Sequence, residues 1–375
     1  MSAPDDALEL LWFCQLAPDT EYLGAPPSRR PTLAYLASLV ETAAEMGFAS
    51  LLTATNYHAE HDAWTASVAT LARTRGAGLL IAVRPGMFHP AVFAKMAATA
   101  ANLFPGRVSV NVVTGSNADE LAMYGDFEDH AARYARTREF TALLRRLWSE
   151  PVVDHVSDRY PLRGAVVAPR PDPAIPIYLG GHSPEAQRIA AEHADVYLLW
   201  GDTVAAVAER LASMREHEAR AGRRVRYGLR CHVIVRETEQ EAWAAADRLV
   251  SRLDPDVRRR FVESAAAVDS EGQRRQAALA GSASLVVEPN LWAGVGLART
   301  GVGVAIVGDA AQVEAKLRAY AALGVRTFIL SGYPHLEECR RFGELVMPRL
   351  RSGQASASVA RDPAPPERAR VAPVT

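Results

Sequence analysis

The sequence contains very little cysteine and has no excess charge of either sign. Cys14, Cys231 and Cys339 are the only cysteines among 375 residues, which excludes a disulfide framework and a cysteine-rich zinc site. The 42 lysines and arginines are balanced by 43 aspartates and glutamates, so the formal net charge is -1. Nucleic acid is therefore not an expected partner, because no global positive field exists to hold a polyanion.

Long apolar runs and several common site fingerprints are also missing. No uninterrupted apolar stretch reaches the roughly 18 residues of a membrane-spanning helix, and residues 1–9 carry acids where a secretion signal begins with bases. We therefore expect a cytoplasmic protein without a membrane partner. The segment His58 to Asp62 lacks the His-Glu-x-x-His spacing, so no metal site is expected. Serine-hydrolase elbows, P-loops and Cys-x-x-Cys motifs are absent too.

The remaining pattern alternates short apolar runs with longer amphipathic stretches, which is typical of repeated βα units. Such units predict a (β/α)8 TIM barrel with insertions. A doubly wound open sheet is the runner-up, but its Gly-x-Gly-x-x-Gly fingerprint does not follow the first strand. The expected strands cover residues 8–14, 50–53, 79–83, 108–113, 177–179, 196–199, 227–235 and 327–330.

Residues 1–350 are expected to form a single barrel domain with two insertions, at about 151–170 and 255–303. The first insertion resembles a hairpin, because β-branched residues flank a polar centre between 152 and 167. The second is helical and then glycine-rich, and it is too long for a routine connector. Residues 351–375 are rich in proline, alanine, serine and arginine without periodicity, which predicts a disordered tail.

Two polar segments after expected strands could hold a ligand. Gly180 to Ser183, followed by Pro184, combines a glycine pair with a capping serine and a helix start, a geometry that suits a phosphate. A tight turn with a capped helix and no ligand explains the same residues. Asn111 and Thr114 end the fourth strand and could bond a polar ring or the loop backbone.

Arginine and histidine side chains form a second candidate group. Arg230 and His232 lie two residues apart on an expected strand, so both point to one face, which must meet water, a counter-ion or a ligand. Arg299, in the glycine-rich segment, could add a second guanidinium or be an ordinary surface arginine. Tyr333 and His335 follow the last strand, where they could take part in proton transfer or begin the closing helix.

Several blocks spread between about Leu10 and Leu350 carry a family resemblance. The longest are residues 230–238, 290–297 and 330–338. The shorter ones are Trp12-Phe13, Tyr22-Leu23-Gly24, Asp62-Ala63-Trp64, Val83-Arg84-Pro85, Asn111-Val112-Val113-Thr114-Gly115, Asp129-His130 with Arg133-Tyr134, and Gly180-Gly181. In these blocks the sequence resembles the FMN-dependent alkanesulfonate monooxygenases of the bacterial-luciferase-like superfamily.

The resemblance implies an oxidoreductase with a luciferase-like TIM barrel. It would use O2 and reduced FMN (FMNH2) supplied by a separate NAD(P)H-dependent flavin reductase. The substrate would be a small organosulfonate, cleaved to sulfite and an aldehyde in sulfur metabolism, and the enzyme would be a homo-oligomer, a dimer or a tetramer. A flavin monooxygenase acting on a non-sulfonate substrate, a deazaflavin-dependent oxidoreductase and a non-catalytic flavin-binding barrel are the alternatives.

The resemblance also implies site residues, position by position. Arg230, His232, Arg299 and Tyr333 would be catalytic, and Trp200, His335 and Glu60 would bind the substrate. Two positions depart from the family pattern: Ala17 replaces a histidine, and Glu60 replaces a cysteine and adds a negative charge that His58, His61 or an arginine must pair with. The cofactor would be held by Asn111, Thr114, His130, Tyr134, Gly181, His182 and Ser183.

Overall fold

A computed structural model describes residues 7–256, 258, 259, 261, 263 and 268–352 of the chain. Apart from Arg351 and Ser352, which continue the final helical segment, the expected tail lies outside the described residues. Among the described helices, none combines the length and the apolar character needed to cross a membrane.

Eight parallel strands of the described chain close into a barrel. Each pairs with the next along the chain, and β13 pairs with both β9 and β1, which joins the two ends of the sheet. The TIM-barrel prediction is therefore confirmed, and an open doubly wound sheet is excluded. The strands are β1(Glu9–Cys14), β2(Ser50–Thr53), β3(Gly78–Val83), β4(Val108–Val112), β7(Ile177–Gly180), β8(Val196–Trp200), β9(Arg226–Arg236) and β13(Val325–Ser331).

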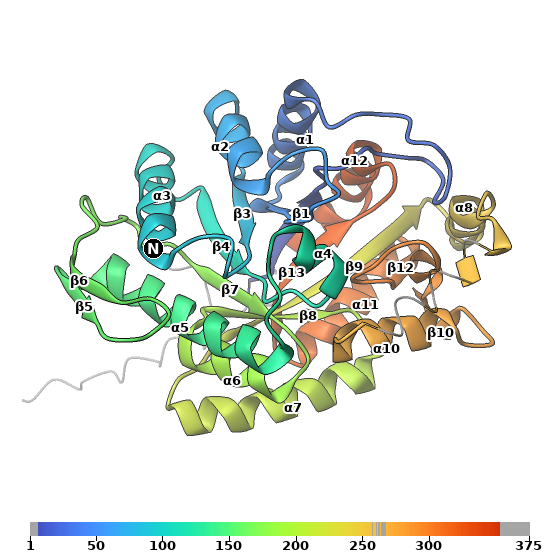
Figure 1. Ribbon diagram of the computed structural model, residues 1–375. Helices are drawn as coiled ribbons and strands as arrows, with labels where there is room; N and C mark the ends of the chain where they lie inside the picture. The colour runs from blue at the N-terminus through green and yellow to red at the C-terminus, as the bar shows by residue number, and fades with distance from the viewer. Residues whose placement is uncertain (1–6, 257, 260, 262, 264–267, 353–375) are drawn as a thin grey trace, which may run out of the picture.

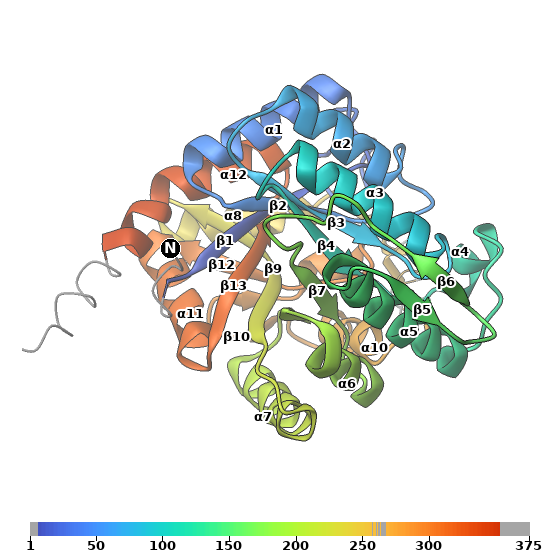
Figure 2. The same ribbon diagram turned by 90° about the vertical axis from the view of Figure 1, so that its left-hand side faces the viewer.

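Helices surround the barrel on the outside (Figures 1 and 2). Local signals set their ends, as in α1, where the Thr32 side chain accepts a hydrogen bond from Tyr35 N–H and Gly47 ends the helix at a φ of 94°. The helices are α1(Leu33–Met46), α2(Ala63–Arg73), α3(Pro90–Leu103), α4(Ala118–Met123), α5(His130–Ser149), α6(Pro184–His193), α7(Val204–Ala221), α8(Glu239–Val250), α11(Ala310–Ala322) and α12(His335–Leu345).

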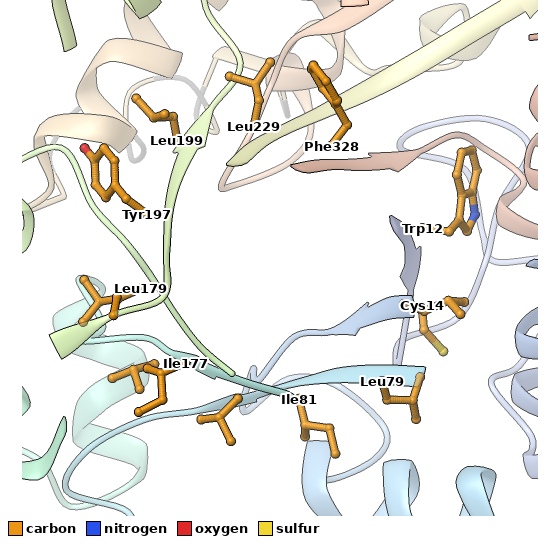
Figure 3. Packing of buried hydrophobic residues seen from close by; sticks show 14 of the residues in the cluster. Trp12, Cys14, Leu79, Ile81, Ile177, Leu179, Tyr197, Leu199, Leu229 and Phe328 are labelled. Carbon is orange, nitrogen blue, oxygen red and sulfur yellow. The ribbon is translucent and has the colours of Figure 1, made fainter. Parts of the chain in front are cut away.

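The barrel strands divide their side chains between two cores. Alternate residues such as Trp12 and Cys14 point outward from the ring of strands, as Figure 3 shows, and pack in the large cluster beneath the helices. Their neighbours Leu11 and Phe13 point inward and pack with Leu52, Leu80, Tyr178, Val196, Leu198 and Ile329. This two-residue alternation decides which side chains of each strand can reach the mouth of the barrel.

Two insertions add further elements to the barrel and lie on opposite sides of it (Figures 1 and 2). The first is an antiparallel hairpin of β5(Val153–His155) and β6(Leu162–Ala165), as expected. The second contains a strand that the sequence did not predict, β12, which pairs with residues 232–236 of β9 beyond the point where β8 ends. Its elements are α10(Glu271–Ala280), β10(Val286–Glu288), β11(Leu291–Trp292), η1(Gly294–Leu297) and β12(Ala305–Asp309).

Candidate active site

Arg230 and His232 lie in the middle of β9, beside Trp200 and Ser331, the last residues of β8 and β13. Both are buried, with 5% and 1% of their surface exposed. Their neighbours Leu229, Cys231 and Val233 belong to the outer core beneath the helices. Arg230 and His232 therefore share the inner face of the strand, as the two-residue spacing predicted.

The guanidinium groups of Arg230 and Arg299 both contact the ring of Phe13. The Arg230 guanidinium carbon lies 4.7 Å from the centre of the Phe13 ring, and that of Arg299 lies 5.0 Å from the same centre. Arg299, which follows η1, also donates a hydrogen bond to the Tyr333 hydroxyl. The structure thus brings together three of the predicted residues, from β9, the second insertion and the loop after β13, on a phenylalanine of β1.

Neither guanidinium is neutralised by a carboxylate among the described residues. Arg230 donates its hydrogen bonds to the Cys231 carbonyl at 2.6 Å and to the Ser331 hydroxyl at 2.8 Å. Burial, followed by the charge of Arg299, lowers the pKa of Arg230 to about 9. Arg230 is buried and Arg299 is half-buried, and two like charges held together in this way are costly. The arrangement is therefore suited to an anion that supplies the missing negative charge.

His232 belongs to the same group through a shared hydroxyl. Its Nδ1 atom lies 2.7 Å from Ser331 Oγ, the atom that also accepts the hydrogen bond from Arg230. The ring stacks against Tyr333 with the ring centres 5.6 Å apart. Burial first, and then the charges of Arg230 and Arg299, holds the pKa of His232 well below its ordinary value, so the imidazole is neutral.

His335 is completely buried and is held by Asp19, a residue that the sequence did not single out. The Asp19 carboxylate accepts hydrogen bonds from the His335 backbone N–H at 2.8 Å, from His335 Nδ1 at 2.9 Å and from the Tyr35 hydroxyl at 2.6 Å. Burial alone would raise the pKa of Asp19, but the charge of His335 and these hydrogen bonds lower it to about 2. His335 lies next to Tyr333, with the ring centres 4.8 Å apart.

The expected phosphate loop lies at the start of α6. Ser183 caps this helix by accepting a hydrogen bond from Ala186 N–H, and Tyr134 of α5 forms a hydrogen bond with the Ser183 side chain. Gly181 has a φ of 150°, and a Cβ there would lie 2.4 Å from the Ala186 Cβ. Burial, followed by the charge of Arg210, lowers the pKa of His182 to about 4. These features leave the backbone at the positive end of the helix open to an anion.

The other predicted cofactor and substrate residues lie around these two groups. His130 begins α5 and packs on Tyr134 with the ring centres 4.7 Å apart. Asn111 and Thr114 are both buried near the carboxyl end of β4. Trp200 ends β8 opposite Arg230 in the sheet, and its ring centre lies 5.9 Å from that of His182. Trp200 therefore lies between the phosphate loop and the cationic group.

Glu60 contacts neither of these groups in the described part of the chain. Its carboxylate pairs with Arg30 at 3.1 Å, so an arginine supplies the counter-charge that this glutamate was expected to need. Glu60 lines a groove of about 510 Å³ between α1 and α2, together with His61 and the apolar side chains of Leu33 and Leu36. No contact joins Glu60 to Arg230 or Arg299 among the described residues, and its role in binding a substrate stays a prediction.

Phe13, Asp19 and Ser331 complete the site but were not predicted as site residues. Phe13 and Ser331 lie on strand ends that the sequence did identify, so alternation along the strands could have placed them at the mouth of the barrel. Asp19 lies in a loop without any local pattern, and its contact with His335 spans 316 positions of the chain. No signal in the surrounding sequence marks it.

Comparison with known proteins places this barrel among the luciferase-like enzymes. Residues 8–327 match the family described as luciferase-like monooxygenase. The match covers most of the chain, so the protein belongs to the luciferase-like monooxygenase family.

Solved structures of the same fold come from enzymes with different substrates. EDTA monooxygenase (EmoA) from Chelativorans sp. BNC1 is 17% identical, with a TM-score of 0.75 over 92% of this chain and 94% of that one. Riboflavin lyase (RcaE), solved with a modified FMN and riboflavin, is 17% identical, with a TM-score of 0.77 over 93% and 92% of the two chains. An F420-dependent secondary alcohol dehydrogenase is 19% identical, with a TM-score of 0.65 over 92% and 99%. At these identities the likeness shows the shared fold alone.

Proposed function

We propose that this protein is a two-component monooxygenase that uses reduced FMN and O2 to cleave an organosulfonate into sulfite and an aldehyde. The observation that carries the proposal is the pair of guanidinium groups, Arg230 and Arg299, which share the Phe13 ring and have no carboxylate partner in the described chain. A sulfonate is a permanent anion with three acceptor oxygens, and planar guanidinium donors match such a group well.

The residues around the phosphate loop fit FMN. Gly181 leaves room that a Cβ would fill, and the hydroxyls of Ser183 and Tyr134 lie beside the start of α6. Asn111, Thr114 and His130 would hold the rest of the cofactor. Bound reduced FMN would supply the two electrons that activate O2, and a separate NAD(P)H-dependent flavin reductase would supply the reduced flavin.

The protein residues would bind and orient the substrate. Arg230 is fixed by the Cys231 carbonyl and the Ser331 hydroxyl, so it would give one contact to the sulfonate without losing much side-chain freedom. Arg299 and Tyr333, joined by a hydrogen bond, would give the second. Trp200 would separate this contact from the phosphate loop and help to exclude water from the reacting atoms.

Sulfite release from a panel of sulfonates tests this proposal. The protein would be supplied with a flavin reductase, NADH, FMN and O2, and sulfite would be measured for each sulfonate. We expect turnover of at least one member of the panel. Arg230→Ala should lower kcat/KM on the order of 100-fold or more, because a charged hydrogen bond to the anion is lost.

The controls separate the substrate from the cofactor. Arg220→Ala, on the exposed outer surface of α7, removes an arginine far from this chemistry and should leave kcat/KM unchanged. FMN affinity, followed by flavin fluorescence, should be similar in both variants. Release of no sulfite from any sulfonate, or full activity of Arg230→Ala, contradicts the proposal. Turnover with reduced deazaflavin but not with reduced FMN would show that the cofactor is wrong.

A further inference from the structure

We infer that the two buried imidazoles of this site carry their protons on opposite ring nitrogens, so that His335 is the proton acceptor of the reaction and His232 is a hydrogen-bond donor. The acceptor role rests on the proposed function, whereas the positions of the protons follow from the hydrogen bonds alone. Asp19 and Ser331 are the positioning residues that set them.

Asp19 fixes the proton of His335 on Nδ1. An ionised carboxylate only accepts hydrogen bonds, so the 2.9 Å contact between Asp19 and Nδ1 requires Nδ1 to be the donor. The backbone of His335 is held as well, since its N–H bonds Asp19 at 2.8 Å and its carbonyl accepts a hydrogen bond from Trp12 Nε1 at 3.0 Å. Nε2 is buried and has no hydrogen-bond partner among the described residues. In the neutral ring this atom carries a lone pair.

Arg230 fixes the opposite arrangement in His232. A guanidinium only donates, so Ser331 Oγ accepts from Arg230 at 2.8 Å. The Ser331 hydroxyl proton is then free to donate, and His232 Nδ1, at 2.7 Å, is the acceptor that the described chain offers it. Nδ1 therefore carries the lone pair, and the single proton of the neutral ring is on Nε2, which, like that of His335, is buried without a hydrogen-bond partner among the described residues.

Surrounding charge keeps the two rings in distinct roles. His232 is buried beside Arg230 and Arg299, and burial together with these two charges disfavours a second proton on its ring. His335 has the ionised Asp19 carboxylate on its Nδ1 side, at 2.9 Å, which leaves Nε2 as the ring atom that can accept a proton. The same kind of side chain is thus placed in two electrostatically opposite environments.

The reaction requires one proton acceptor. When a carbon that carries a sulfonate becomes an aldehyde carbonyl, one C–H bond breaks and its proton must leave. The C–S bonding pair departs with sulfite, one oxygen atom of O2 enters the carbonyl, and the other becomes water with the two electrons and two protons of reduced FMN. His335 Nε2 would receive the C–H proton, while His232 Nε2–H would donate a hydrogen bond to a sulfonate oxygen.

Nitrogen NMR of the full-length protein reads the protons directly, without substrate or turnover. The protein, labelled with ¹⁵N in its ten histidines, would be examined at about pH 8, above the usual imidazole range. The pair of ring-nitrogen signals lost in His232→Gln, and the pair lost in His335→Gln, assign the two rings. We expect a bare Nδ1 in His232 and a bare Nε2 in His335, and the same tautomer in both rings would overturn the inference.

Variants of the positioning residues test the roles. Ser331→Ala removes the donor to His232 and should change the ¹⁵N pattern of that ring alone, whereas Ser331→Thr keeps the hydroxyl and should preserve the pattern. Asp19→Asn should lower kcat for sulfite release on the order of 100-fold with little change in KM, because the charge behind His335 is lost. An unchanged kcat would overturn the acceptor role. Correct tautomers without sulfite release from any sulfonate would refute the proposed function and, with it, the acceptor role, and leave only the proton positions standing.

Discussion

Single side chains at the mouth of this barrel act through the charge of their neighbours. Arg230 has no carboxylate of its own and depends on carbonyl and hydroxyl oxygens, whereas His335 has a carboxylate held by a tyrosine and by backbone. Asp19, with a pKa of about 2, stays ionised over the whole range in which proteins are usually stable. The chemistry of each group is therefore set by residues that would never touch a substrate.

Gly181 gives a prediction at the scale of one residue. Gly181→Ala places a Cβ 2.4 Å from that of Ala186 at a φ that side chains rarely adopt, so the loop before α6 must shift. We expect FMN affinity to fall about 10-fold or more, a loss of at least about 1.4 kcal/mol, as measured by quenching of flavin fluorescence.

Gly222→Ala is the matched control. Gly222 ends α7 at a φ of 62°, and a Cβ added there would have nothing within 4 Å. The alanine substitution therefore strains the backbone but causes no steric clash. It should lower the free energy of unfolding by about 1 kcal/mol and leave FMN binding unchanged. Equal FMN affinity in the two variants would remove Gly181 from the cofactor site.

At the scale of elements, the barrel strands were predictable and several additions were not. Buried strands such as β3 read as continuous apolar runs, and alternation along β9 placed Arg230 and His232 on one face. The strand β12 was missed because its pairing with β9 is non-local, and a short apolar run beside glycines predicts a loop equally well. Helix α7 was not assigned, although its buried residues Val207, Leu211 and Met214 recur at helical spacing.

Within the site, local pattern identified the strand-end residues, but it gave neither their partners nor the position of Glu60. Asp19 could be recognised as a partner of His335 only once β1 and β13 were known to be neighbours. Glu60 was assigned to the substrate through the family resemblance, and its pairing with Arg30 beside α1 could not be read from the local sequence. Contacts between distant segments form only when the barrel closes, so they cannot be predicted from a short stretch of sequence.

Arg107 gives a prediction at the element scale, at the opposite end of the barrel. Just before β4, its guanidinium donates to the carbonyls of Thr74 and Ala77, at 2.8 and 3.0 Å, and so joins the end of α2 to two strands. Arg107→Ala should lower the free energy of unfolding by about 2 to 3 kcal/mol, as measured by urea denaturation. FMN binding should not change. Arg75→Ala, which removes a nearby like charge, should cause no loss, and an equal loss would contradict this explanation.

At the scale of the whole molecule, buried neutral histidines make stability depend on pH. The pKa of His182 falls from 6.5 to about 4 on folding, first through burial and then through the charge of Arg210. The unfolded chain therefore takes up this proton at a higher pH than the folded chain does. Keeping His182 neutral therefore costs no free energy of unfolding above about pH 6.5. As the pH falls from 6.5 toward 4, the free energy of unfolding decreases by at most about 3 kcal/mol.

His182→Gln tests this dependence in the cofactor-free protein. Urea denaturation at several pH values should show a flatter fall in the free energy of unfolding between pH 6.5 and 4 than in the unchanged protein, because one titrating group is gone. His232, whose pKa is also lowered by burial and nearby arginines, should account for part of the remaining slope. A slope that stays the same in His182→Gln would contradict the assignment.

The pairing of β13 with β1 also determines when the site can first exist during synthesis. Phe13 and Asp19 leave the ribosome more than 300 positions before Ser331 and His335, since Asp19 and His335 are 316 positions apart in the chain. A nascent chain that has not yet released β13 has no neighbour for the free edge of β1 and no histidine beside Asp19. Completion of the candidate site and closure of the barrel are therefore a single late event, and a chain that stops before this strand lacks both.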